Sequence, residues 1–215
     1  MPTRSFARMG RHEMLVELGR RVHARGLIAG AEGNLSCRLP GGQILITPAG
    51  RGKANLAEED LALLSPEGAI LRGCPSSERL LHAEVYRRCP EAVWVIHAHP
   101  PAVVAWSLAH PETTEMPAGF LAETLLTFER IPIATYARPG GEALAKSVAP
   151  FLPDSRAIIL ERHGAICWDE SAEGALSLME QLEQAALILR DAFLMGHPRP
   201  LTEAERRAIL EERKP

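Results

Sequence analysis

The chain has 215 residues, of which 46% are hydrophobic and 24% charged, and these ordinary globular proportions exclude a disordered or fibrous chain. We expect one compact domain over residues 1–215, with residues 1–10 as a loose arm and residues 196–215 as a C-terminal helical tail. A net charge of -3 and an aromatic content of 5% predict no nucleic-acid or membrane partner and favour a small-molecule ligand. The basic N-terminus lacks the apolar stretch of a targeting signal, so we expect a cytoplasmic protein.

The first third of the chain predicts a helix, two hairpin-like segments and the start of a second helix. Apolar residues recur at helical spacing over residues 11–25, and Gly26 is a typical helix stop. A strand is predicted at residues 43–47 after a Gly-Gly turn, and a hairpin over residues 65–71. The segment at residues 75–78 is typical of a helix start, because serine hydroxyls accept hydrogen bonds from free N–H groups.

The rest of the chain alternates strands with helices. Strands are predicted at residues 92–98, 131–136 and 157–160, and helices at residues 102–109, 142–148 and 171–194, before a charged helical tail. Pro132 lacks an N–H group, so we expect the strand that contains it to lie at an edge of the sheet. The alternation has no break in composition and no repeat. It predicts one α/β domain, and the hairpins imply a mixed or antiparallel sheet.

Three histidines lie at the end of predicted strands or just beyond them. His97 and His99 are two residues apart at the end of one strand, so both imidazoles point to one face and can meet at one ion. This pattern alone also fits two ordinary histidines, but His163 follows another strand and brings a third imidazole to the same edge. Three protein ligands with one open position are typical of a catalytic zinc site. We therefore predict one Zn2+, or another divalent metal ion, held by His97, His99 and His163.

A carboxylate and donor-rich loops accompany the histidines. Glu78 follows two serines at a helix N-terminus, where hydroxyl and amide donors either bind a phosphate or carboxylate or cap the helix. The segments at residues 33–36 and 47–50 have small residues that let amides approach an oxyanion. His82 lies four residues after Glu78 on the same helix face. It either orients that carboxylate or is a buried structural histidine.

Five short motifs, GNLS, TPAG, SSE, HAHP and RHG, occur in this order between Leu18 and Leu189, together with the later segment IPIATYARPG. In this order and at these separations they resemble the class II aldolase/adducin family. The resemblance implies a three-layer α+β domain, in which helices flank a central, nine-stranded, mainly antiparallel sheet. It also implies a divalent metal ion and a homotetramer with active sites at the subunit interfaces.

The resemblance assigns roles to the matching positions of this chain. His97, His99 and His163 would bind the metal, and Glu78 would be the catalytic acid and base. The residues implied to bind the substrate phosphate are Asn34, Gly50, Ser76 and Ser77. The implied activity is that of a zinc-dependent lyase, which cleaves a small ketose phosphate such as L-fuculose 1-phosphate to dihydroxyacetone phosphate and an aldehyde.

Two positions depart from the pattern of the family's aldolases. Ala49 replaces a hydroxyl residue of the phosphate loop, which removes one donor. The tyrosine that stabilises the departing aldehyde oxygen has no counterpart, because no tyrosine lies between Tyr86 and Tyr136, and Phe120 or Leu121 stands near its place.

Other reactions of the family are therefore alternatives. A decarboxylase of a 3-oxo sugar-acid phosphate, of the 3-oxo-tetronate 4-phosphate type, needs no acid at an aldehyde oxygen and is the first alternative. A pentulose-phosphate epimerase and a dehydratase follow. A non-enzymatic module like the adducin head is disfavoured, because that head lacks the metal-binding histidines that this chain has.

Overall fold

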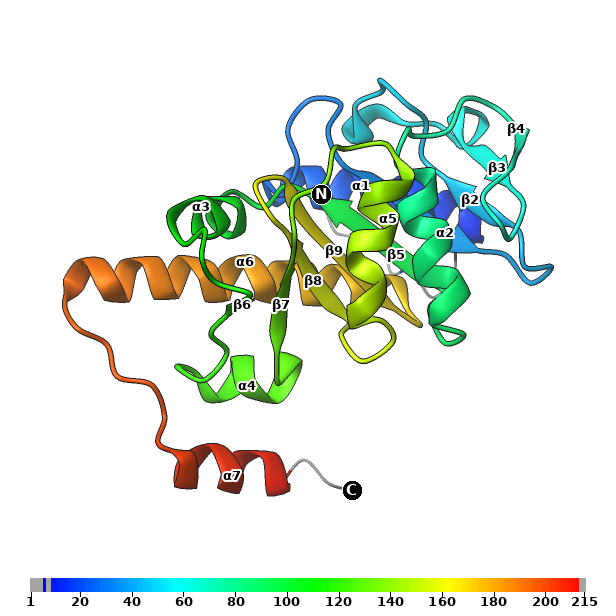
Figure 1. Cartoon of the computed structure of the whole chain (residues 1–215). Coiled ribbons are helices and arrows are strands. Elements are labelled where there is room, and N and C mark those ends of the chain that lie inside the picture. Colours follow the sequence, from blue (N-terminus) through cyan, green and yellow to red (C-terminus); the bar gives the residue numbers. More distant parts are fainter. Residues whose placement is uncertain (1–5, 7–8, 213–215) are drawn as a thin grey trace.

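A computed structural model describes residue 6 and residues 9–212, and its centre is a nine-stranded sheet in the order β4-β3-β2-β1-β5-β9-β8-β7-β6 (Figure 1). The strands are β1 (Asn34–Arg38), β2 (Ile44–Ile46), β3 (Ala62–Leu64), β4 (Ile70–Arg72), β5 (Trp94–Ala98), β6 (Glu115–Met116), β7 (Ile131–Ala134), β8 (Ala157–Leu160) and β9 (Gly164–Asp169). The α-helices are α1 (Arg11–Ala24), α2 (Arg79–Arg88), α3 (Pro101–Ala109), α4 (Ala122–Phe128), α5 (Glu142–Val148), α6 (Ala172–Met195) and α7 (Glu203–Glu212). Short 3-10 turns occur at η2 (Lys53–Asn55), η3 (Glu58–Asp60) and η4 (Ala149–Phe151).

Helices cover both faces of the sheet. One core packs α1, α3 and α6 against it, and a second core packs α2 and α5 against the opposite face (Figure 1). Successive side chains of β5 pack into opposite cores: Ile96 lies in the first core and Val95 in the second. Every residue of β5 is buried, as expected of a strand with both faces covered. The expected three-layer domain is confirmed.

The sheet is mixed and mainly antiparallel, because β7 with β8 is the parallel pairing among the described strands. The expectation that the Pro132 strand forms an edge is wrong: β7 lies second from the edge, between β8 and β6. The outer partner is only two residues long, and Pro132 lies opposite Glu115 there. The missing N–H of Pro132 is tolerated against this short partner, while Ile133 and Ala134 pair with β8.

Beyond residue 196 the chain continues without regular structure and then forms α7 from Glu203 to Glu212. It lies beside α4, and the Leu201 amide donates to the Gly119 carbonyl at 2.8 Å. The expected loose arm at residues 1–10 falls mainly on residues 1–5 and 7–8, which lie outside the described residues, as do residues 213–215.

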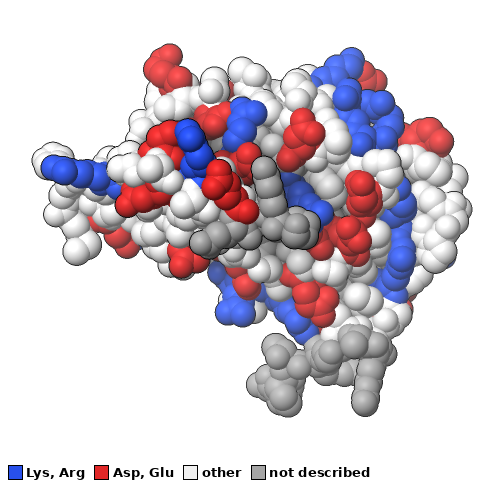
Figure 2. Space-filling model, turned by 90° about the horizontal axis from the view of Figure 1, so that it is seen from below, with Lys and Arg blue, Asp and Glu red and all other residues white. Residues whose placement is uncertain are grey.

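Lysine and arginine side chains lie among aspartate and glutamate side chains on the face that Figure 2 shows. None of the described helices has the length and apolarity needed to cross a membrane. All four cysteines are free thiols.

Candidate active site

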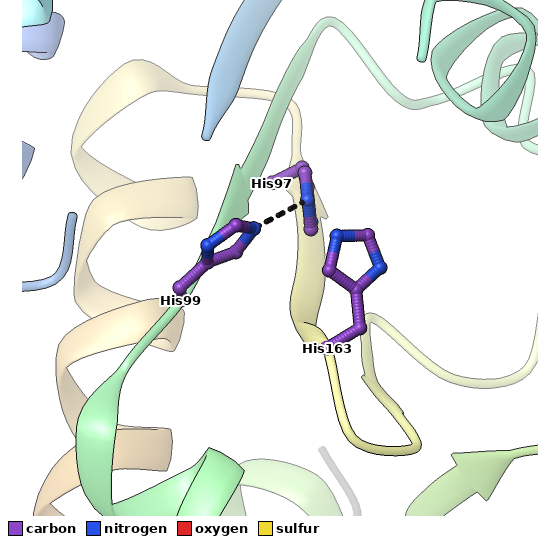
Figure 3. Close-up of side chains that lie close together, drawn as sticks. All are labelled: His97, His99 and His163. Carbon is purple, nitrogen blue, oxygen red and sulfur yellow. Dashed lines mark hydrogen bonds between the residues drawn. The ribbon is translucent and has the colours of Figure 1, made fainter. Parts of the chain in front are cut away.

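The three predicted histidines meet at one end of the central strands. His97 is on β5, in register between Asn34 of β1 and Ile166 of β9, and His99 follows the end of the strand. His163 lies in the tight turn between β8 and β9. Because β9 runs antiparallel beside β5, that turn lies next to His99, as Figure 3 shows. Strand pairing therefore brings together residues that are 66 positions apart in the sequence.

The turn that carries His163 is held closely against β5. Arg162 adopts a left-handed backbone with φ of 58°, and its amide donates to the buried Ser107 hydroxyl at 3.0 Å. At Gly164, a Cβ atom would stand 2.3 Å from the Ala98 carbonyl oxygen. A side chain at this position would push the turn away from His99, so the RHG motif needs its glycine here.

The distances between the imidazoles suit a metal ion. Nε2 of His97 and Nε2 of His99 lie 3.1 Å apart, and ligand atoms of all three histidines lie within 4.8 Å of one another. Nδ1 of His97 donates to the Ala165 carbonyl at 3.0 Å, and Nδ1 of His99 lies 3.3 Å from Glu32 Oε2. The Nε2 atoms of His97 and His99 therefore face the cluster. A tetrahedral zinc ion with bonds of 2.0–2.1 Å would hold its ligand nitrogens about 3.3–3.4 Å apart, so these residues fit the ion.

Burial keeps His99 and His163 in the neutral state that a metal requires. It lowers the pKa of His163 to about 4, with a further lowering by the nearby charge of His97. Burial and His97 also lower the pKa of His99, although Glu32 opposes this. Metal ligands must be deprotonated to bind. Neutral imidazoles at neutral pH therefore favour metal binding over proton binding.

Glu78 lies directly against the histidine cluster from the start of α2. Its Oε2 atom is 3.1 Å from His97 Nε2, and its Oε1 atom is 3.4 Å from His163 Nε2. Burial favours the protonated carboxyl, but the hydrogen bond and charge of His97, and the hydrogen bond from Asn34, outweigh it. The pKa of Glu78 therefore lies well below its usual range. Oε1 is buried without a hydrogen-bond partner among the described residues, and a metal ion or substrate proton would satisfy it.

A chain of buried hydrogen bonds fixes Glu78 from behind. The Asn34 amide donates to Glu78 Oε2 at 2.8 Å, and its oxygen accepts from His82 Nε2 at 2.5 Å. His82 Nδ1 accepts from the Ser36 hydroxyl at 2.7 Å, and that hydroxyl also contacts the Tyr86 hydroxyl at 2.8 Å. His82 thus acts on Glu78 through Asn34 and not by direct contact. Asn34 also retains a second N–H, because its amide nitrogen carries two.

The predicted phosphate-binding residues line a cavity of about 400 Å³ in front of the cluster. Those that face it are Asn34, Gly50, Ser76 and Ser77, together with Glu78, His99 and His163. Ser77 is exposed, whereas the buried Ser76 hydroxyl accepts from the Glu78 amide at 3.3 Å. The Ala49 amide already donates to the Cys74 carbonyl at 3.0 Å, so it is not free for an anion. Gly50 has φ of 68°, and its amide has no acceptor among the described residues.

Lys53 also lines this cavity, and sequence reasoning did not find it. It stands three residues beyond the TPAG motif in the charged, Gly-containing stretch RGK, which has no apolar pattern. A larger hollow of about 450 Å³ lies between α2 and α5. It contains none of the predicted site residues and no histidine, so we do not assign the chemistry to it.

The sequence matches the family model of the class II aldolase and adducin N-terminal domain over residues 13–189. The chain therefore belongs to the class II aldolase/adducin family. It is 31% identical over 186 residues to a 3-oxo-tetronate 4-phosphate decarboxylase of Escherichia coli K12, with 86% of each chain covered. It is 33% identical over 180 residues to a methylthioribulose-1-phosphate dehydratase of Gluconobacter oxydans, covering 79% of this chain and 86% of the relative.

Solved structures show the same fold. YgbL of Escherichia coli, described as an aldolase, epimerase or decarboxylase, superposes with a TM-score of 0.85 at 30% identity, covering 92% of this chain and 96% of its own. The L-fuculose-1-phosphate aldolase of Thermus thermophilus superposes with a TM-score of 0.76 at 33% identity, covering 87% of this chain and 97% of its own. The family and the fold that the motifs predict are confirmed. The relatives do not share one reaction, because they include decarboxylases, dehydratases and aldolases.

Proposed function

We propose that this protein is a metal-dependent decarboxylase of a small 3-oxo sugar-acid phosphate, of the 3-oxo-tetronate 4-phosphate type. The observation that carries the proposal is which side chains of the site can donate or accept a proton. Glu78 is the buried carboxylate at the histidine cluster and contacts His97 and His163. The other carboxylate, that of the exposed Glu32, pairs with Nδ1 of His99, which faces away from the cluster. No tyrosine lies between Tyr86 and Tyr136. Decarboxylation needs one proton at one carbon, which one carboxylate can deliver. This choice reverses the order that the sequence motifs favour, in which aldol cleavage comes first.

The reaction follows from the positions of these groups. The substrate carboxylate leaves as carbon dioxide, and the electron pair of the broken C–C bond forms an enediolate with the neighbouring 3-oxo group. A divalent ion held by His97, His99 and His163 would supply the positive charge that stabilises this enediolate. Glu78 is placed to deliver a proton to the enediolate carbon, which gives dihydroxyacetone phosphate. Glu78 is ionised in the free site, so it would first take this proton from water. The negative charge of the substrate raises the pKa of the carboxyl group and favours that uptake.

The remaining features of the proposal concern the ion, the phosphate and the assembly. Three imidazoles and a carboxylate suit zinc, and we assign one ion to each chain. The substrate phosphate is assigned to Asn34, through its second N–H, and to Gly50, Ser76 and Ser77. We also propose a cytoplasmic homotetramer with active sites at subunit interfaces. The exposed apolar side chains at the end of α6, Phe193, Leu194 and Met195, support an interface between copies.

Product analysis tests the reaction type. The zinc-loaded protein is incubated in turn with 3-oxo-tetronate 4-phosphate, L-fuculose 1-phosphate and methylthioribulose 1-phosphate, while carbon dioxide and triose phosphate are measured. We expect carbon dioxide and dihydroxyacetone phosphate from the first substrate only, and none with the His163→Ala variant. Triose phosphate from L-fuculose 1-phosphate, without carbon dioxide from the first substrate, would contradict the proposal.

Aldol cleavage is the second candidate. The likeness to the Thermus thermophilus L-fuculose-1-phosphate aldolase supports it, and so does the SSE motif. An aldolase working with this chain's residues would have to stabilise the aldehyde oxygen without a phenol at the place of Phe120. The same incubations separate the two candidates, because only decarboxylation releases carbon dioxide.

A further inference from the structure

Lys53 is a buried cation beside the candidate active site. Its exposed fraction is 1%, although lysine is almost never fully buried without a partner charge. The residue lies in η2, whose backbone packs on α1 at Gly19. A Cβ atom at Gly19 would stand 3.1 Å from the Lys53 carbonyl oxygen and 3.3 Å from its Cβ atom. The glycine in α1 therefore allows the fold to hold this lysine inside.

The Lys53 ammonium connects two loops of the cavity through neutral groups. Nζ donates to the Ala31 carbonyl at 2.7 Å and to the Arg51 carbonyl at 3.0 Å. In the part of the chain that the structure describes, no carboxylate forms an ion pair with it. Burial lowers the pKa of Lys53 to about 8, with partial opposition from Glu78, so the ammonium is charged at neutral pH. A buried charge without a counter-charge is costly, and an anionic ligand would offset that cost.

The surroundings of Lys53 are suited to such an anion. The cavity that it lines is also lined by Gly50, Ser76 and Ser77. The two loops approach closely, since a Cβ atom at Gly52 would stand 3.3 Å from the Gly30 carbonyl oxygen. The free Gly50 amide and the serine hydroxyls offer hydrogen bonds but no net charge. A phosphomonoester carries two negative charges, and hydrogen bonds alone would leave them uncompensated.

We propose that Lys53 supplies the fixed positive charge of the phosphate site and holds the loops of residues 30–33 and 47–52 in their binding arrangement. The inference rests on the proposed function, because it takes the ligand to be the dianionic phosphoryl group of the substrate. It adds a charged residue to a site that the family motifs describe only by amides and hydroxyls.

Charge and hydrogen bonding at Lys53 are separated by two substitutions. Lys53→Met removes both, whereas Lys53→Gln keeps a donor for the loop carbonyls and removes the charge. Lys146→Met is the matched control, because Lys146 is exposed on α5 and pairs with Glu142 away from the cavity. Binding of inorganic phosphate to the zinc-loaded proteins is measured by calorimetry, and KM and kcat are measured with the phosphorylated substrate. Circular dichroism checks that each variant is folded.

We expect both Lys53 variants to bind phosphate about ten- to a hundredfold more weakly than the wild type. KM should rise by a similar factor, with kcat within a few-fold and zinc content unchanged, and Lys146→Met should match the wild type. Wild-type affinity in Lys53→Gln would overturn the role of the charge and leave only a hydrogen-bonding role. Phosphate affinity within twofold of the wild type in every folded Lys53 variant would overturn the inference while leaving the proposed function intact. A wild-type protein that neither binds phosphate nor converts phosphorylated substrates would contradict the proposed function itself.

Discussion

The cavity has two walls that are built by different means. The strand wall consists of His97, His99 and His163, and sheet register fixes it: each histidine lies at or next to the end of a buried strand. The loop wall consists of residues 30–33, 47–53 and 76–78, and turns, glycine conformations and one buried lysine fix it. The strand wall is tied to both cores of the domain. The loop wall can therefore change in sequence, and with it the ligand, while the metal chemistry stays the same.

The largest effects that we expect are those of substitutions at Glu78 and His163, and together they distinguish proton transfer from metal binding. Glu78→Gln should retain zinc, because the three imidazoles remain, but lower turnover by about 10²–10⁴, the usual contribution of a positioned acid or base. His163→Ala removes a ligand and should lose both zinc and activity. Zinc content by elemental analysis and turnover of the same preparations test this distinction. Near wild-type turnover in Glu78→Gln would remove its assigned role.

Two glycines with similar backbone angles, Gly33 beside the strand wall and Gly50 in the loop wall, test the difference between the walls. Gly33 has φ of 64°, and an added Cβ atom would stand 2.6 Å from Ile28 Cγ2 and 2.8 Å from the His97 carbonyl oxygen. Gly50 has φ of 68° and no heavy atom within 4 Å of such a Cβ. Gly33→Ala should cost about 3 kcal/mol of stability, from backbone strain and overpacking, whereas Gly50→Ala should cost about 1 kcal/mol from strain alone.

The ligands affected should differ as well. Gly33→Ala presses on the backbone of His97, so zinc affinity should fall, while Gly50→Ala should weaken phosphate binding and spare zinc. Urea unfolding, zinc titration and phosphate calorimetry on both variants measure the three quantities. Equal stability losses would show that Gly33 is not packed against β5 as described.

The sequence predicts the strand wall better than the loop wall, and the reason is physical. His97, His99 and His163 each follow an apolar run, and strand alternation and pairing are regular enough to bring such residues to one edge. Lys53 has no such signal, because its burial depends on the close approach of two loops and on Gly19 of another element. The edge position predicted for the Pro132 strand is wrong for a similar reason. The rule that proline favours edge strands is local, and it does not predict that the two-residue strand β6 pairs outside β7.

The hydrogen-bonded chain of Asn34, His82 and Ser36 behind Glu78 joins the two walls, and we expect its sensitivity to acid to be a smaller effect than the loss at Gly33. His82 is fully buried among Asn34, Ser36 and Tyr86. Burial, with a contribution from His97, lowers its pKa to about 3, against about 6.5 in an unfolded chain. The unfolded chain therefore binds more protons than the folded one between these values, so the stability that neutral His82 provides is lost as the pH falls through this window.

Comparison with a His82→Gln variant isolates this contribution. Between pH 6.5 and pH 5 the wild type should lose about 2 kcal/mol more of its free energy of unfolding than the variant, as measured by urea titration of the metal-free proteins. His99 and His163 also have lowered pKa values, but both are present in the two proteins and so cancel in the difference. Parallel pH profiles would mean that His82 gains no proton on unfolding, and that the Asn34 contact does not depend on a neutral imidazole. A steeper wild-type profile would identify His82 as the neutral donor that keeps the Asn34 amide turned toward Glu78.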